Sequence, residues 1–233
     1  MRVKRNLDEL IYDKMVDSII AAQWSAGEVI SVEEIAARYE VSRTPVVQAI
    51  KRMCIEEIVE LLPNGRVRFP CSTIEQIRDV CATRVMMEEK AGEILCGGDA
   101  RPDCEALRQM IEECGQCRRD GNYLRAGQLD REFHRAIVGA AGNSYLETLY
   151  GLVQKKFLTI NYLNRPAETV VTEAAAKEHF AILDALEKRD YPEYCRQVRR
   201  HLEAIQTSLA EKKPSSRRPE KDIYSEDSVF GGI

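Results

Sequence analysis

The sequence predicts a mainly α-helical protein in two parts, a small N-terminal part that contains a β-hairpin and a larger part built of helices alone. Apolar residues recur at helical spacing over most of the chain, and strand-like segments occur only before Pro70. Hydrophobic residues make up 44% of the 233 residues, which is enough for a buried core and suits two domains. The expected domains are 1–70 and 71–211, followed by a flexible tail at 212–233 that lacks apolar periodicity.

Three helices are expected in the N-terminal part. Apolar residues at helical spacing predict the first over 7–22. Ser31 and Glu34 form a capping box, in which each side chain satisfies a free backbone N–H of the other residue, so a second helix begins there and ends near Glu40. Ser42 is predicted to cap a third helix, with Pro45 in the first turn, where the missing N–H of proline costs little.

Two short strands are expected after these helices. Segments 58–62 and 66–69 have strand-like composition and flank Pro-Asn-Gly at 63–65, a triplet that suits a hairpin tip. Past Pro70 the strand signals disappear, and the larger part is expected to be an all-α antiparallel bundle. Its predicted helices are 73–95, 102–119, 123–141, 145–163, 169–188 and 191–210.

Charge and hydropathy exclude several classes of protein. The net charge of −4 argues against a protein that coats nucleic acid through charge alone. Segment 41–55 nevertheless has three basic residues and no acidic one, so a local basic face is expected there. The chain begins without the apolar core of a signal peptide and has no apolar run near 20 residues, so we expect a cytoplasmic protein without a membrane segment.

The eight cysteines are expected to be reduced thiols, because they are scattered through helix-like segments of a long chain without an export signal. Cys114 and Cys117 form a single C-x-x-C pair. A zinc site of that kind needs a second pair and a thioredoxin-like motif needs a preceding strand, so no function is assigned to these two cysteines.

Residues 41–46 read V-S-R-T-P-V, after a capped helix and before an Asn-Gly hairpin. In this setting they resemble the winged helix-turn-helix of the GntR superfamily. The resemblance implies a homodimeric transcription regulator that binds a double-stranded DNA operator, with its recognition helix beginning near Ser42. Arg43 can donate two hydrogen bonds to a guanine, while Ser42 and Thr44 can reach phosphates. The expected DNA contacts are Ser42, Arg43, Thr44, Val47, Gln48, Lys51 and Arg66.

The chain departs from this family at two places. The family usually continues with Arg-Glu, where this chain has Val47 and Gln48, and it often has Glu-Gly where this chain has Glu56 and Glu57. The missing arginine is commonly a DNA contact. We therefore expect an altered or weaker operator preference, with Val47 against a thymine methyl group.

The three histidines of the chain suggest a metal site in the helical part. Asp130 and His134 lie one helical turn apart on one face, a spacing at which two side chains can bind one ion. His179 and His201 lie on later helices, and side chains from separate helices of a bundle can converge. Each histidine taken alone is more often a packed or surface residue than a ligand.

The neighbours of these residues strengthen the interpretation. L-D-R-E-F-H-R-A-I at 129–137, E-H-F at 178–180 and R-H-L at 200–202 resemble the FCD ligand-binding domain of the FadR subfamily of GntR regulators. With the DNA-binding part, the resemblance covers about residues 7–210. It implies that Asp130, His134, His179 and His201 bind a divalent metal, with zinc the expected ion, and that a small organic-acid effector binds there.

Arg84 falls where this family usually has an arginine on the first helix of the sensor domain. A guanidinium offers a planar fork for a carboxylate, so Arg84 is a candidate contact of an anionic effector. An ion pair with a nearby glutamate, at the surface or between the domains, is the competing interpretation.

The leading functional hypothesis is a regulator, not an enzyme, whose operator affinity changes when a carboxylate effector binds at the metal. A metal-dependent enzyme that uses the same aspartate and histidines is disfavoured. No activated nucleophile or general base is evident, and an enzyme would not need the DNA-binding domain. The third alternative is a regulator whose metal is purely structural and locks the bundle.

Overall fold

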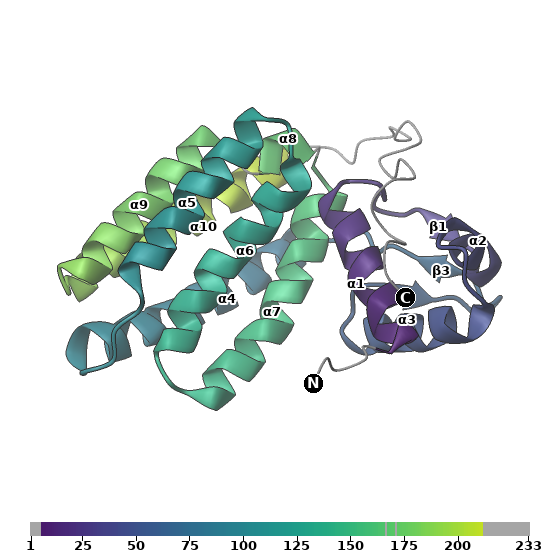
Figure 1. Ribbon diagram of the computed structural model, residues 1–233, viewed down its shortest axis with the longest axis horizontal. Helices are drawn as coiled ribbons and strands as arrows, with labels where there is room; N and C mark the ends of the chain where they lie inside the picture. The colour runs from purple at the N-terminus through teal and green to yellow at the C-terminus, as the bar shows by residue number, and fades with distance from the viewer. Residues whose placement is uncertain (1–5, 166, 171, 212–233) are drawn as a thin grey trace, which may run out of the picture.

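The N-terminal part is a three-helix unit with a small sheet. Helices α1 (Leu7–Ile20), α2 (Val32–Arg38) and α3 (Arg43–Ile55) pack on one another, and strands β1 (Val29–Ile30), β2 (Glu60–Leu61) and β3 (Val67–Arg68) form an antiparallel sheet in the order β1-β3-β2. The computed structural model describes residues 6–165, 167–170 and 172–211, so the predicted tail at 212–233 lies outside the described residues. This arrangement is a winged helix-turn-helix (Figure 1).

The C-terminal part is an all-α bundle, as predicted (Figure 1). Helix α10 packs against α4 and α9, α5 packs against α6 and α9, and α7 packs against α4 and α6. The helices are α4 (Ile74–Gly97), α5 (Cys104–Arg119), α6 (Tyr123–Ala140), α7 (Ser144–Leu163), α8 (Ala167–Val170), α9 (Glu173–Glu187) and α10 (Tyr191–Glu211).

The structure corrects the predicted elements in three details. Strand β1 was not expected, because two residues leave no periodic pattern. The single helix predicted over 169–188 is two helices, since Thr172 caps α9 by accepting a hydrogen bond from the Ala175 N–H. Ser42 occupies the N-cap position of α3, but its side chain makes no capping hydrogen bond. The capping box of Ser31 and Glu34 is confirmed, with Glu34 N–H donating to Ser31 Oγ at 3.1 Å.

Helix α1 joins the two parts. Its apolar face packs on α3 and also on α6 and α7, so the core of the winged helix is continuous with Leu129, Leu158 and Tyr162 of the bundle. Gly127 on α6 permits this approach, because a β-carbon there would overlap Ile20 and the Tyr162 hydroxyl. In Figure 1, α1 lies beside α7 at the boundary between the winged helix and the bundle.

The end of the recognition helix explains the glycine that the resembled family often has there. Glu57 follows the C-cap residue Glu56 and has φ +54°, in the left-handed region that favours glycine. Its carboxylate forms a 3.1 Å ion pair with Lys156, but that carboxylate is 75% exposed, so the pair contributes little stability.

We expect Glu57→Gly to raise the free energy of unfolding by about 0.5–1 kcal/mol, because glycine adopts positive φ without strain. Urea denaturation measures the change. Glu57→Ala is the matched control, since it removes the same carboxylate but keeps the β-carbon, and it should not stabilise the protein. A glycine variant no more stable than the alanine variant would contradict the prediction.

Candidate metal centre and DNA-binding surface

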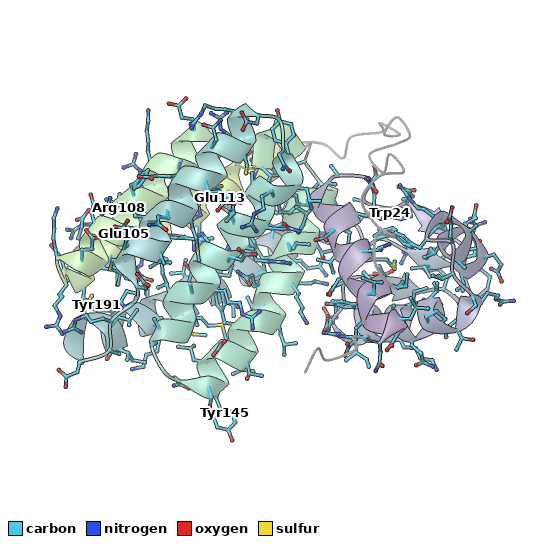
Figure 2. The ribbon with its side chains drawn as sticks, in the orientation of Figure 1. Trp24, Glu105, Arg108, Glu113, Tyr145 and Tyr191 are labelled. Carbon is cyan, nitrogen blue, oxygen red and sulfur yellow. The ribbon has the colours of Figure 1, made fainter. Side chains whose placement is uncertain are left out.

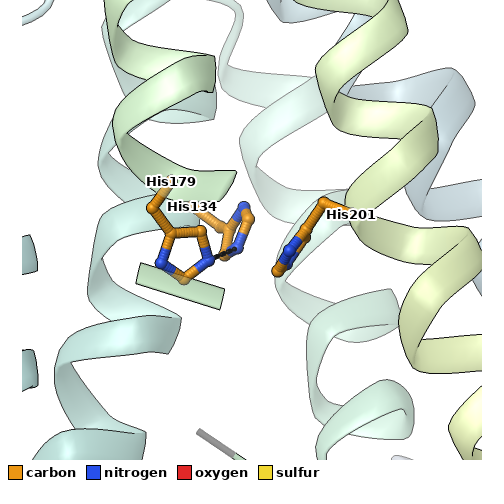
Figure 3. Close-up of side chains that lie close together, drawn as sticks. All are labelled: His134, His179 and His201. Carbon is orange, nitrogen blue, oxygen red and sulfur yellow. Dashed lines mark hydrogen bonds between the residues drawn. The ribbon is translucent and has the colours of Figure 1, made fainter. Parts of the chain in front are cut away.

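Three buried histidines meet inside the bundle from three different helices. His134 lies on α6, His179 on α9 and His201 on α10, and each side chain is at most 2% exposed. Their ring centroids are 4.7–5.1 Å apart, and Figure 3 shows the rings turned toward a common point. The predicted convergence of residues 45 and 22 positions apart in the chain is therefore present in the structure.

The spacing of the histidine nitrogens fits a shared ion. His134 Nε2 and His179 Nε2 are 3.2 Å apart, and one potential ligand atom from each histidine lies within 4.8 Å of the others. Two ligands that bind one Zn²⁺ tetrahedrally at about 2.0–2.1 Å are themselves about 3.3 Å apart. Asp130 Oδ1 lies 3.4 Å from His179 Nε2, so the fourth predicted ligand borders the cluster.

Two further carboxylates orient these histidines. Glu88 Oε2 lies 3.1 Å from His134 Nδ1, and Glu178 Oε2 lies 2.8 Å from His201 Nδ1. An ionised carboxylate only accepts hydrogen bonds, so each Nδ1 carries the proton and each Nε2 keeps its lone pair for a ligand bond. Metal-binding histidines commonly have such partners. We did not predict Glu88 from sequence, and the one local signal was its position four residues after Arg84.

Burial favours the neutral form of two of the imidazoles, His134 and His179. Loss of hydration lowers the pKa of His134, although Glu88 opposes the shift, and it lowers the pKa of His179 well below its usual value, with His201 and His134 adding to the effect. Neutral imidazole is the form that coordinates metal. The donor set and the 3.2 Å spacing of its closest pair therefore fit a divalent ion.

Arg84 is buried and already paired. Its Nε and Nη2 both donate to Glu88 Oε1, at 3.0 and 2.6 Å, and its guanidinium lies 4.2 Å from the ring centroid of Phe157. Tyr150 also donates to Glu88 Oε1, at 2.8 Å. Burial alone would raise the pKa of Glu88, but Arg84 and His134 outweigh it and hold that pKa below its ordinary value. A contact between Arg84 and an effector stays a prediction.

Two cavities border Asp130. The smaller, about 20 Å³, is lined by Arg84, His134 and the Tyr162 hydroxyl, which has no hydrogen-bond partner among the described residues. A space of this size holds about one water molecule. The larger, about 160 Å³, also borders His201 and has room for a small ligand.

The predicted DNA-binding residues lie on the recognition helix and the wing. Arg43 is the first residue of α3 and forms a 2.9 Å ion pair with Glu33 of α2, with both side chains more than half exposed. Val47 differs from the other predicted DNA contacts, because it is half-buried and packs on the core of the winged helix. Arg66 is exposed and donates to the Val29 carbonyl at 3.1 Å. The other four, Ser42, Thr44, Gln48 and Lys51, are exposed.

A charged cluster connects the end of the recognition helix to the bundle. Glu56, the C-cap residue of α3, accepts hydrogen bonds from Tyr12 of α1 and from Lys155 of α7, the latter at 2.6 Å. Burial would raise the pKa of Glu56, but the bonds from Lys155 and Tyr12 and the charge of Arg52 lower it. Helix α7 therefore contacts the recognition helix directly through a charge-assisted hydrogen bond.

The C-x-x-C pair has no metal-site geometry. Cys114 is buried and its thiol donates to the Ala126 carbonyl at 3.3 Å, while burial raises its pKa to about 12. Every cysteine in the chain is a free thiol in the structure. The expectation of reduced cysteines is consistent with this arrangement.

Family models match most of the chain. The model of bacterial regulatory proteins of the gntR family matches residues 7–69, and the FCD domain model matches residues 79–204. The fold and these matches define a winged-helix DNA-binding protein with a helical C-terminal domain. The chain belongs to the GntR family of transcription regulators that carry an FCD domain, and it is a regulator, not an enzyme.

Individual relatives agree with this assignment. The chain is 24% identical over 220 residues to the HTH-type transcriptional regulator BphR of Paraburkholderia xenovorans, covering 86% of this chain and 84% of BphR. It is 21% identical over 226 residues to the HTH-type transcriptional repressor RspR of Escherichia coli, covering 95% of each. The solved structure of E. coli McbR/YncC has the same fold, with a TM-score of 0.73 at 15% identity over 89% of this chain and 98% of McbR/YncC.

Within the described part of the chain, no helix is both long and apolar enough to cross a membrane.

Proposed function

We propose that this regulator binds a palindromic operator as a homodimer and that a small carboxylate effector, bound at a divalent metal in the helical domain, changes its operator affinity. The observation that carries the proposal is the buried cluster of three histidines beside a cavity. Asp130, His134, His179 and His201 would hold the ion, with zinc the expected metal. The proposed domains are 1–70 for DNA binding and 71–211 for sensing.

The ion would supply a positively charged binding point for a carboxylate. Three neutral imidazoles and one carboxylate leave a divalent ion with net positive charge, and fewer than six protein ligands leave room for an anion or water. A purely structural ion would need no cavity beside it. The 160 Å³ cavity bordered by Asp130 and His201 therefore favours a sensory site over a structural one.

Helix α7 supports a route from the sensor to the DNA. Gln154, Phe157 and Asn161 on this helix line the smaller cavity beside Asp130 and His134. Lys155, between them in sequence, bonds to Glu56 at the end of the recognition helix. A ligand that shifts α7 would therefore shift a residue attached to the recognition helix, which is the physical coupling that regulation requires.

An apolar face supports the dimer. Tyr145, Leu149 and Leu152 lie on one face of α7 and are exposed, as is Met86 on the neighbouring helix α4. Figure 2 shows Tyr145 projecting from the start of α7. Exposed apolar clusters of this kind mark interfaces. RspR, which this chain resembles over 95% of both chains, is a repressor, so we propose repression, acting in the cytoplasm where the operator lies.

Operator binding under metal and acid control tests the proposal. An operator is first selected from random-sequence DNA, and metal-loaded protein is then titrated against it with and without organic acids of two to six carbons. An acid that stabilises the loaded protein should change operator affinity about 5- to 150-fold, and chelation of the metal should abolish that response. Acid-independent binding of metal-loaded protein would overturn the effector proposal.

Lys155→Met tests the route through α7. This variant keeps most of the length of the unbranched side chain but removes the charged group that bonds to Glu56. We expect it to bind metal and acid as the wild type does but to lose most of the acid-dependent change in operator affinity. Arg196→Ala, which breaks an exposed ion pair on α10, is the control and should respond normally. A full response in Lys155→Met would contradict the route.

Leu149→Glu tests the dimer. A charge at the centre of the apolar face should weaken self-association, because the glutamate would be desolvated in the interface. Sedimentation at micromolar concentration should give a dimer for the wild type and a monomer for the variant. Glu173→Ala, at an exposed position on α9, should leave the dimer intact. A dimeric Leu149→Glu variant would place the interface elsewhere.

A further inference from the structure

Arg165 is a buried cation with an unused hydrogen-bond donor. It follows α7, its side chain is 7% exposed, and its Nη1 donates to Asn161 Oδ1 at 3.0 Å while its Nη2 donates to the Thr169 carbonyl. Both bonds are to neutral groups. Its Nε has no hydrogen-bond partner among the described residues. An unpaired donor on a buried charge is costly, so this Nε is a candidate to bind a ligand.

Arg165 is one of the residues that line the larger cavity. Asn161 and Thr172 line it too, together with two predicted metal ligands, Asp130 and His201. The first turn of α9 also borders it through Ala174 and Ala175, and a helix N-terminus favours an anion. At about 160 Å³ the cavity is well below the ~300–1,000 Å³ of sites for drug-sized ligands, so its ligand must be small.

The charges in this cavity call for two anionic groups on one ligand. The metal would be one positive centre and Arg165 the other. The Glu178 carboxylate also lines the cavity, but it is already bonded to His201 and does not pair with Arg165. Arg84 does not serve as the second positive centre for the ligand. Two of its nitrogens are bonded to Glu88, and it borders the cavity that holds only about one water molecule.

We infer that the effector is a small dianionic acid, with one carboxylate at the metal and the second accepting a hydrogen bond from Arg165 Nε. The inference rests on the proposed function and names the chemical class of its effector. Arg165 is thus a specificity-determining residue: the metal recognises any carboxylate of suitable size, and Arg165 selects acids that carry a second one.

Calorimetric titration of the zinc-loaded, full-length protein tests the inference. The probes are malonate, succinate, glutarate and adipate, each compared with the monocarboxylate of equal carbon number: propionate, butyrate, valerate or hexanoate. We expect at least one dicarboxylate to bind roughly 10- to 100-fold more tightly than its matched monocarboxylate, the effect of a charge-assisted hydrogen bond in a buried site.

Arg165→Gln should reduce that advantage to below about threefold while zinc content and monocarboxylate affinity stay unchanged. Arg165→Lys keeps the charge and should retain part of the advantage. Arg108→Gln removes a partly buried ion pair between α5 and Glu187 of α9, at a residue that does not line the cavity, and should retain all of it. If Arg165→Gln fails to fold, the comparison of dicarboxylates with monocarboxylates on the wild-type protein still tests the inference.

Two outcomes separate this inference from the proposed function. If monocarboxylates bind in a zinc-dependent way and no dicarboxylate binds more tightly, or if Arg165→Gln keeps the full advantage, the inference is wrong and the proposed function stands. If no acid of either series binds the zinc-loaded protein, both are wrong.

Discussion

Replacing His179 by alanine is expected to lower the affinity of the protein for Zn²⁺ by at least about 100-fold. Loss of a residue that only orients a metal ligand typically costs 10–100-fold in affinity, and His179 would be a ligand itself. Its Nε2 lies within 3.4 Å of both His134 Nε2 and Asp130 Oδ1, so it occupies the centre of the donor set. Competition with a chromophoric chelator measures the affinity, and elemental analysis should find close to one divalent ion per wild-type chain.

Two variants on the same helix sharpen this result. Lys177→Ala, 78% exposed on its side chain and two residues before His179, should bind zinc as the wild type does. Glu178→Gln removes the charge that holds His201 Nδ1. Its zinc affinity should lie between those of Lys177→Ala and His179→Ala, with a loss of roughly 10-fold. A wild type that carries no divalent metal, or a His179→Ala variant with unchanged affinity, would remove the metal centre from the proposed mechanism.

Replacing Arg43 by alanine is expected to weaken binding to the selected operator by about 1–3 kcal/mol, or roughly 5- to 150-fold. Arg43 begins the recognition helix and its side chain is 69% exposed, so it can enter the major groove without repacking the domain. The loss should concentrate at one base pair of each half-site, because a bidentate contact to guanine is specific. Fluorescence anisotropy with operators mutated at single positions measures both effects.

The ion pair of Arg43 with Glu33 provides a second variant. Glu33→Ala frees the guanidinium and removes a negative charge from the surface that faces DNA, so it should keep or raise operator affinity. Arg196→Ala, with a side chain 66% exposed on α10, is the matched control and should bind as the wild type does. An equal loss on all DNA sequences for Arg43→Ala would assign Arg43 to the phosphates.

Local sequence determined most of the helices, the capping box at Ser31 and the type of each domain. The capping box of Ser31 and Glu34 and the one-turn spacing of Asp130 and His134 involve residues three or four positions apart, which helix geometry alone brings together. V-S-R-T-P-V followed by an Asn-Gly hairpin indicated a winged helix through its resemblance to the GntR superfamily, and each of these signals lies within a few residues of the chain. The pattern at 169–188 failed only where Thr172 interrupts it.

The tertiary structure alone decided which distant side chains meet. His134, His179 and His201 converge because α6, α9 and α10 pack with these positions facing inward, and the bonds from Glu88 to His134 and from Lys155 to Glu56 span 46 and 99 residues. Periodicity shows that a face is buried but not which partner it meets.

The positive φ of Glu57 and the unused donor of Arg165 likewise have no local signal. Glu57 lies in the turn that closes α3, in which the Ile58 N–H donates to the Met53 carbonyl at 2.8 Å, and the unpaired Nε of Arg165 becomes evident only where the folded bundle buries it. Local propensity is a sum over neighbouring residues, whereas a binding site is a property of contacts made across the fold.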